Sequence, residues 1–253
     1  MSKIVEIENI LKNKLVGDFY CAKDNNCDNV VVFVHGFLAG RKWNGRFVQF
    51  AKSLAENNIN VYSFDLTGYG ESSDENITIS SGILDVKCIL SYLRFQKYKS
   101  IGLVGHSLGG IICLNQDFSK ISKLCLLAPV TDKIHYSFTE KFGNIVMNKM
   151  HNQGYFDFKG NPSKGYREFF RVSEKLEDER EKIDQKEVLS KCSVDTLIIH
   201  GDKDKLVSLS DSKKAIKYLN SNSKLEILSD EGHFFDSNLD KVSKLISTWF
   251  TNM

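Results

Sequence analysis

The chain has 253 residues, of which 42% are hydrophobic and 26% charged. This is a globular composition, and it excludes collagen-like, disordered and disulfide-scaffold proteins. Lys and Arg number 34 against 32 Asp and Glu, so the formal net charge is only +2. Binding to a phosphate backbone needs a strongly basic face, so we expect no nucleic-acid partner. The six cysteines are irregularly spaced in a chain too long to need disulfide bonds, and we interpret them as free thiols.

The N-terminal residues and the hydropathy pattern indicate where the protein resides. Glu6 and Glu8 lie where a signal peptide needs an apolar centre. No apolar run approaches the ~20 residues of a membrane-spanning helix. We therefore expect a cytoplasmic protein without integral membrane association.

The predicted elements begin with an antiparallel hairpin and continue as an alternation of strands and helices. Two β-rich runs, 4–7 and 15–21, flank a polar Lys12-Asn13-Lys14 turn and predict the hairpin at one sheet edge. Continuous apolar runs, typical of strands buried on both faces, follow with helical stripes between them. This alternation predicts right-handed βαβ crossovers and a mostly parallel sheet. The predicted buried strands are 30–34, 61–64, 101–104, 124–127, 196–200 and 225–228, and the helical stripes are 47–55, 83–93 and 239–250.

One long segment, 131–186, interrupts the alternation because it holds no buried strand. It is rich in aromatic residues and predicts an inserted cap, with 1–130 and 187–253 forming the core. The expected elements of the cap are a helix over 138–150, a short hairpin over 154–160, a helix over 166–176 and a solvated charged helix face or loop over 177–182.

A Gly-x-Ser-x-Gly motif surrounds Ser107, between the strand 101–104 and a helical run that begins at Leu108. A serine at the tip of so sharp a turn needs glycines two residues away on either side, where strand and helix approach each other. The amide of Leu108 then points toward a developing oxyanion. The pattern predicts a nucleophilic serine.

A nucleophilic serine needs a histidine base and an acid that orients it. Gly201-Asp202-Lys203-Asp204 follows one buried strand and Gly232-His233 follows the next. Serine, aspartate and histidine therefore follow one another along the chain in the order that is typical of proteins with this kind of turn.

Together with the strand end His35-Gly36-Phe37 and the loop 65–72 (Asp-Leu-Thr-Gly-Tyr-Gly-Glu-Ser), these motifs resemble the α/β-hydrolase family over most of the chain. The resemblance implies an α/β-hydrolase fold, with a mostly parallel central sheet, helices on both faces and a small inserted cap. It also implies that Ser107 is the nucleophile, His233 the general base and Asp204 the orienting acid. Asp132 is the alternative candidate for the acid. Asp202 is expected to stabilise its own turn.

The same resemblance implies the other half of the oxyanion hole and part of the substrate site. The backbone amide of Phe37 is the expected partner of the Leu108 amide, and the Phe37 ring is free to line the acyl pocket. Tyr155 and Phe156 lie in a glycine-flanked stretch too short to form a core, so we expect them to reach the substrate. The strand-end histidines His35 and His200 are expected to make local hydrogen bonds.

The expected reaction is hydrolysis of a small-molecule carboxylic ester through an acyl-enzyme, without a metal or organic cofactor. Within the family, the chain most resembles bacterial and archaeal cinnamoyl or feruloyl esterases and monoacylglycerol lipases. The alternatives are a monoacylglycerol lipase or lysophospholipase and a thioesterase, followed by a carbon–carbon bond hydrolase and a non-catalytic ligand-binding protein. Fold-level likeness does not choose among them, and the oligomeric state is open.

Overall fold

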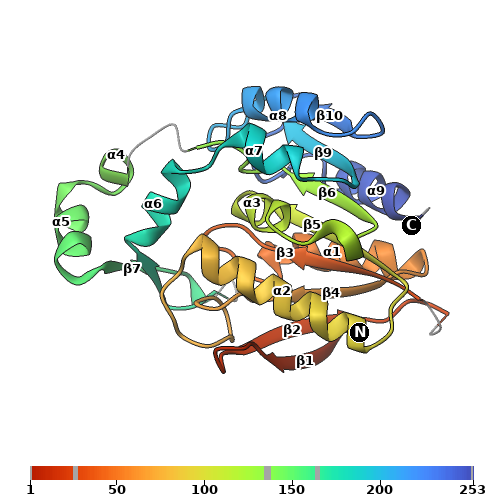
Figure 1. Ribbon diagram of the computed structural model, residues 1–253, viewed down its shortest axis with the longest axis horizontal. Helices are drawn as coiled ribbons and strands as arrows, with labels where there is room; N and C mark the ends of the chain where they lie inside the picture. The colour runs from red at the N-terminus through yellow and green to blue at the C-terminus, as the bar shows by residue number, and fades with distance from the viewer. Residues whose placement is uncertain (1, 25–27, 134–137, 163–165, 252) are drawn as a thin grey trace.

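The computed structural model describes residues 2–24, 28–133, 138–162, 166–251 and 253. In this part of the chain, eight strands form the main sheet (Figure 1). They are β1 (Lys3–Glu8), β2 (Lys14–Tyr20), β3 (Asn29–Val34), β4 (Asn60–Phe64), β5 (Ser100–His106), β6 (Lys123–Leu127), β9 (Asp195–Gly201) and β10 (Lys224–Leu228). Their spatial order is β1-β2-β4-β3-β5-β6-β9-β10. The β1–β2 and β2–β4 pairs are antiparallel, and the other pairs are parallel.

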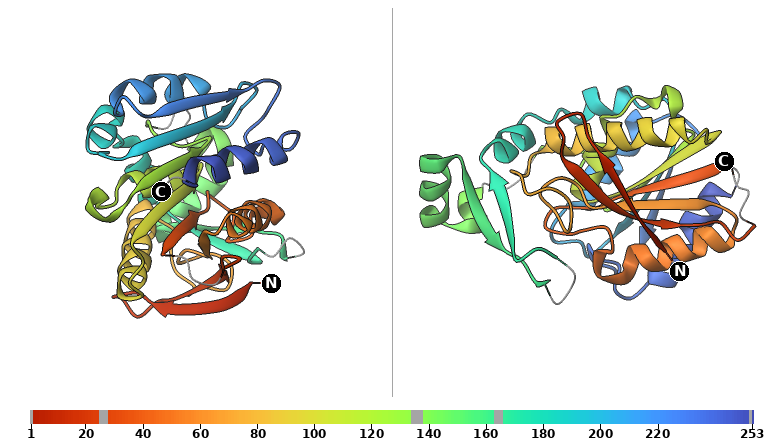
Figure 2. Two further views of the ribbon diagram at one scale, coloured as in Figure 1. Left: turned by 90° about the vertical axis from the view of Figure 1, so that its right-hand side faces the viewer. Right: turned by 90° about the horizontal axis from the view of Figure 1, so that it is seen from below.

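Helices cover both faces of this sheet (Figures 1 and 2). They include α1 (Arg46–Glu56), α2 (Ile79–Phe95), α3 (Leu108–Leu114), α7 (Gln185–Ser190), α8 (Leu209–Ala215) and α9 (Leu239–Phe250). Side chains on β3 alternate between the faces, as a strand requires. Val31 and Phe33 lie in one core cluster with α1 and α9, whereas Val30 and Val32 lie in the other with α2 and α3. The α/β architecture and the edge hairpin predicted from the sequence are thus confirmed.

The segment between β6 and α7 lies beside the main sheet (Figure 1). Its described elements are α4 (Phe138–Phe142), α5 (Asn144–Gln153), β7 (Tyr155–Lys159), β8 (Phe169–Ser173) and α6 (Lys175–Glu181). The charged run expected as a helix face or loop falls largely within α6. No helix in the described ranges is long and apolar enough to cross a membrane.

Three expectations for this segment are wrong in detail. The helix expected over 138–150 is divided, because Gly143 between α4 and α5 has φ +83°, outside the helical region. The stretch expected as a self-contained hairpin supplies only β7. Its antiparallel partner is β8, within the range where we expected a helix. Phe170 and Val172 are buried while Phe169 is exposed, a period of two that belongs to a strand.

Candidate active site

Ser107 lies at the tip of the turn between β5 and α3. Its backbone has φ +53° and ψ −118°, a left-handed conformation that L side chains rarely adopt. The glycines of the motif make the turn sterically feasible. A Cβ at Gly105 would stand 2.6 Å from the carbonyl oxygen of Gly109, and a Cβ at Gly109 would clash with that of Val34. The strained backbone therefore holds the hydroxyl of Ser107 at the carboxyl end of the parallel strand.

Asp204 and His233 meet although they follow different strands, β9 and β10. The distance from His233 Nδ1 to Asp204 Oδ2 is 2.7 Å, and the side chains are 6% and 0% exposed. The other carboxylate oxygen, Oδ1, accepts the backbone N–H groups of Leu206 and Val207. Burial by itself raises the pKa of Asp204, but hydrogen bonds from His200 and His233 outweigh it and hold that pKa below its usual range. Asp204 is thus kept ionised beside His233.

The competing carboxylates have other partners. Asp202 Oδ1 accepts the backbone N–H of Asp230, so Asp202 braces the loop after β10 rather than its own turn. Asp132 Oδ1 accepts the N–H of Lys133. The structure therefore brings Asp204, and neither of these two, to the ring of His233.

The strand end that follows β3 passes directly beside the serine. A Cβ at Gly36 would stand 2.9 Å from Ser107 Cβ, so only glycine permits this approach. The imidazole of His35 fixes the turn, because its Nε2 accepts the backbone N–H of Leu66 and its Nδ1 donates to the carbonyl of Gly36. Burial lowers the pKa of His35 although Asp65 opposes the effect.

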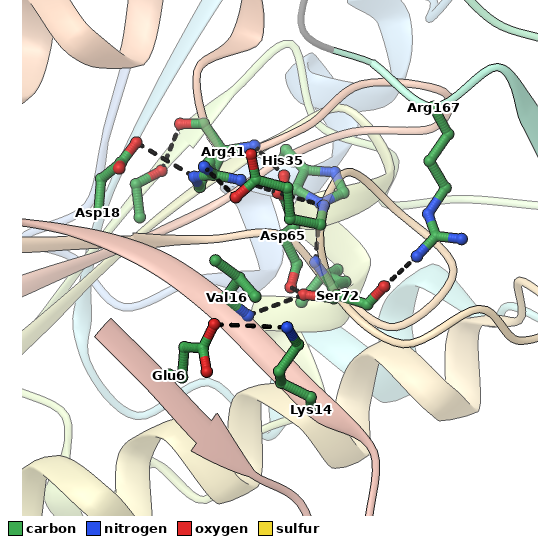
Figure 3. Close-up of polar contacts among 12 residues, drawn as sticks. Glu6, Lys14, Val16, Asp18, His35, Arg41, Asp65, Ser72 and Arg167 are labelled. Carbon is green, nitrogen blue, oxygen red and sulfur yellow. Dashed lines mark hydrogen bonds and ion pairs between the residues drawn. The ribbon is translucent and has the colours of Figure 1, made fainter. Parts of the chain in front are cut away.

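The far end of the same loop is anchored by Arg41 (Figure 3). The Arg41 backbone N–H donates to Asp65 Oδ1 at 2.7 Å, and its buried guanidinium contacts Asp65, Asp18 and Glu71. Burial alone would lower the pKa of Arg41, but Asp65 and Asp18 outweigh it and raise that pKa. The loop carrying Phe37 is therefore held at both ends by buried polar contacts.

Ser107 and His233 open onto one pocket with a volume of about 310 Å³. Phe37 and Leu108, expected to supply the oxyanion amides, line the same pocket. Its other lining residues include Trp43, Lys141, Tyr166, Arg180, Leu206, Val207 and Phe234.

Tyr155 and Phe156, expected at the substrate, are not among the residues that line this pocket. Phe156 is 3% exposed and packs against Phe142, with ring centroids 5.0 Å apart. The guanidinium of Arg171 lies over the half-buried ring of Tyr155, 4.9 Å from its centroid. The β7–β8 pairing buries Phe156 in the segment's own core, because β8 adds the facing layer that the short stretch lacks by itself.

Sequence reasoning missed Tyr166, Trp43 and His106. Tyr166 has no distinguishing signal within its aromatic-rich segment, and Trp43 lies in a short turn before α1. His106 precedes the serine and lines the pocket. Its ring stacks on Trp43 with centroids 3.7 Å apart, and its Nε2 lies 3.3 Å from the carbonyl oxygen of His233. Burial, reinforced by His233, holds the pKa of His106 well below its usual value.

In the described ranges, no three His, Cys, Asp or Glu side chains are grouped so that they could hold a metal ion. The chemistry that the pocket offers comes from a hydroxyl, an imidazole and a carboxylate. A histidine held by an ionised aspartate, lining the same pocket as a serine on a strained turn, is suited to nucleophilic catalysis.

Comparison with known proteins gives a family match over most of the chain. The sequence model described as "Alpha/beta hydrolase family" matches residues 31–242. The "Putative esterase/lipase 2" of Mycoplasma genitalium is 26% identical over 152 residues, which cover 58% of this chain and 54% of that protein. The chain matches less than two thirds of the length of its curated relatives.

Solved structures share the fold at low sequence identity. The structure titled "Ferulic Acid bound to Est1E from Butyrivibrio proteoclasticus" has a TM-score of 0.79 and 20% identity, over 96% of both chains. A monoacylglycerol lipase from Paleococcus ferrophilus has a TM-score of 0.73 and 18% identity, over 94% of this chain and 98% of that one. At these identities the likeness is one of fold, and the expected architecture is confirmed.

Proposed function

Because this chain belongs to the alpha/beta hydrolase family, we propose that it is a serine hydrolase that cleaves carboxylic esters through an acyl-enzyme intermediate. The observation that carries the proposal is the 2.7 Å contact between the buried carboxylate of Asp204 and His233, which lines the same pocket as Ser107. Esterase and lipase relatives support the same class of reaction.

The proposed reaction has two half-steps. The Oγ of Ser107 attacks the ester carbonyl carbon while His233 Nε2 accepts its proton, and Asp204 stabilises the resulting imidazolium. The backbone amides of Phe37 and Leu108 bind the oxygen on which negative charge develops. Collapse of the tetrahedral intermediate expels the alcohol, which takes the proton from His233. Water then repeats the sequence on the acyl-enzyme, releasing the acid and restoring Ser107.

The acyl group in this proposal is short or aromatic. The pocket volume of about 310 Å³ is at the lower end for small-molecule sites, and aromatic rings of Phe37, Trp43, Tyr166 and Phe234 line it. These features favour a feruloyl-type ester, the ligand class named with one structural relative, over a long acyl chain. Residues 131–186 act in this proposal as a cap, because Lys141, Tyr166 and Arg180 from that range line the pocket.

Substitution of the three proposed catalytic residues tests the reaction. Ser107→Ala and His233→Ala are each expected to lower kcat by several orders of magnitude, because triad members act as a unit. Asp204→Asn should also be severe, whereas Asp132→Asn, a matched control for the acid, should leave the rate near that of the parent protein. The measurement is hydrolysis of 4-nitrophenyl acetate and methyl ferulate, with a fluorophosphonate probe to label Ser107.

Retention of most activity by Ser107→Ala would exclude the proposed nucleophile. If Asp132→Asn lost activity and Asp204→Asn kept it, the acid would be assigned wrongly. A protein that hydrolyses none of the esters and does not react with the probe would instead be a non-catalytic member of the family.

A further inference from the structure

A second histidine contacts the carboxylate of Asp204. His200, on β9, is 0% exposed, and its Nε2 lies 3.2 Å from Asp204 Oδ2. This is the oxygen that also accepts from His233 Nδ1 at 2.7 Å. The other ring nitrogen of His200, Nδ1, lies 2.8 Å from the Oγ of Ser212, a fully buried residue of α8. One carboxylate oxygen is therefore shared by two imidazoles.

The neighbours of His200 define which of its nitrogens carries the proton. Its Nε2 faces two acceptors, the carboxylate of Asp204 and, at 3.2 Å, the carbonyl oxygen of Val207. In a neutral imidazole one nitrogen donates and the other accepts. Nε2 is then the donor, and Nδ1 accepts the hydroxyl hydrogen of Ser212. The result is a continuous chain of hydrogen bonds from Ser212 through His200 to Asp204.

His200 is not needed merely to hold the carboxylate in place. The opposite oxygen, Oδ1, already accepts two backbone N–H groups, from Leu206 at 2.8 Å and Val207 at 2.9 Å. What His200 adds is a second donor on Oδ2, the oxygen that faces His233. A donor on a carboxylate oxygen stabilises the ionised form and makes that oxygen a weaker acceptor for any other group.

We propose that His200, oriented by Ser212, is a positioning residue that shares Asp204 Oδ2 with His233 and thereby limits how strongly Asp204 stabilises protonated His233. This proposal rests on the triad proposed above. Its consequence is that His233 remains neutral, and able to accept the proton of Ser107, at lower pH than Asp204 alone would permit.

Other charged and titratable groups also lie near the two histidines. The ring of His106 lies 4.9 Å from that of His233. The carboxylate of Glu231 accepts from Gly232, Ser237 and Asn238 in the loop that carries His233. Arg46 of α1 donates to the backbone of the neighbouring Phe234, and Asp211 precedes Ser212 on α8. These residues are the same in both His200 variants, so a titration that differs between the variants reports the donor on the shared oxygen.

The experiment compares His200→Gln with His200→Met. The two side chains have similar length, but only the glutamine amide replaces the Nε2 donor. We expect the acid limb of kcat/KM for 4-nitrophenyl acetate to move up by about half a pH unit or more in His200→Met. Relative to the parent protein, the rate at pH 5 then falls by about threefold or more while the rate at pH 8 changes little. His200→Gln should restore the parent profile, and KM at pH 8 should stay the same in both.

A second readout does not depend on activity. In protein labelled with ¹⁵N-histidine, the titration midpoint of the His233 ring is expected to rise in His200→Met and not in His200→Gln. The ¹⁵N shifts should show His200 protonated at Nε2. Ser212→Ala, which removes one hydroxyl, should raise the same midpoint by a smaller amount, and it carries the test if His200→Met does not fold.

A parent-like midpoint in folded His200→Met, or in folded Ser212→Ala where His200→Met does not fold, would overturn the proposal. An equal rise in the glutamine and methionine variants would do the same, because loss of packing rather than loss of the donor would then cause it. A protein that shows the midpoint shifts but hydrolyses no ester would contradict the proposed function and leave this inference standing.

Discussion

Gly36 lies where the loop after β3 passes closest to Ser107. A Cβ at this position would meet Ser107 Cβ at 2.9 Å and both the carbonyl oxygen and Nδ1 of His106 at 3.1 Å. Such contacts are too short to accommodate without movement of the loop. Because Gly36 lacks a Cβ, the loop can place the Phe37 amide, the proposed oxyanion donor, close to the nucleophile.

We expect Gly36→Ala to lower kcat by about tenfold to a hundredfold, because the loop carrying the Phe37 amide must shift away from Ser107. The loss stays below the ~10²–10³ that removal of an oxyanion donor costs, since the donor is displaced rather than deleted. The measurement is kcat and KM for 4-nitrophenyl acetate.

Gly232→Ala is the matched control for this change. Gly232 also lies next to a proposed catalytic residue, but a Cβ there would meet no atom within 4 Å. Parent-like kcat in Gly36→Ala would show that the Phe37 amide does not stabilise the rate-limiting transition state.

Specific polar contacts connect the elements between β6 and α7 to α2 and to the loop that precedes it. On α6, the carboxylate of Glu179 accepts the backbone N–H groups of Ile79 and Ser80 at the start of α2. Arg167, just before β8, contacts the carbonyl of Ser72 (Figure 3). It also contacts the carboxylate of Asp74. Tyr166, the neighbour of Arg167, lines the pocket of Ser107 and His233.

Tyr166 is therefore expected to select the acyl group, whereas Tyr155 is not. Removing one aromatic wall of a pocket costs about 1–3 kcal/mol of transition-state binding for a substrate that contacts it. We expect Tyr166→Ala to lower kcat/KM for methyl ferulate by that amount and to spare 4-nitrophenyl acetate. Tyr155→Ala, its control within the same segment, should leave both rates unchanged. Equal losses of kcat/KM on both esters in Tyr166→Ala would show that its ring does not contact the acyl group.

At the scale of the whole molecule, two buried histidines couple folding to pH. Burial lowers the pKa of His35 and of His106, so both remain neutral in the folded protein below the ~6.5 at which unfolded histidine titrates. As the pH falls below that value, the unfolded chain takes up protons that the folded chain does not. Their contribution to the free energy of unfolding is thus present above pH ~6.5 and is lost as the pH falls.

We expect the free energy of unfolding to decrease below pH ~6.5 by up to about 1.4 kcal/mol per pH unit for each of these histidines. The pKa of Asp204 is lowered, so Asp204 contributes a further loss of unfolding free energy only below pH ~3.9, the pKa of an unfolded aspartate. Urea unfolding at pH 7.5, 6.0 and 5.0 measures the slope, and His35→Asn should reduce it. Equal stability at the three pH values would contradict neutral burial of the two rings.

Much of the core follows from neighbours in the sequence. The alternation of buried strands with amphipathic helices predicted the parallel sheet, and the glycines around Ser107 predicted the strand-to-helix turn. Both are local patterns, set by side chains two to four residues apart. The resemblance to a family, rather than spacing, selected Asp204 among the competing carboxylates.

Contacts between distant residues were decided only by the tertiary structure. Residues 166–176 have helix-like spacing of apolar residues, yet β8 forms there. It pairs with β7 through backbone hydrogen bonds, and its side chains Phe170 and Val172 form a buried face. That pairing buries Phe156 and leaves Tyr166 at the pocket. His200 was predicted as a local strand-end residue, but packing of α8 against β9 places Ser212 on one of its nitrogens while Asp204 meets the other. Local sequence determines an element's period, whereas the partner of each polar or apolar group is chosen by which distant elements pack together.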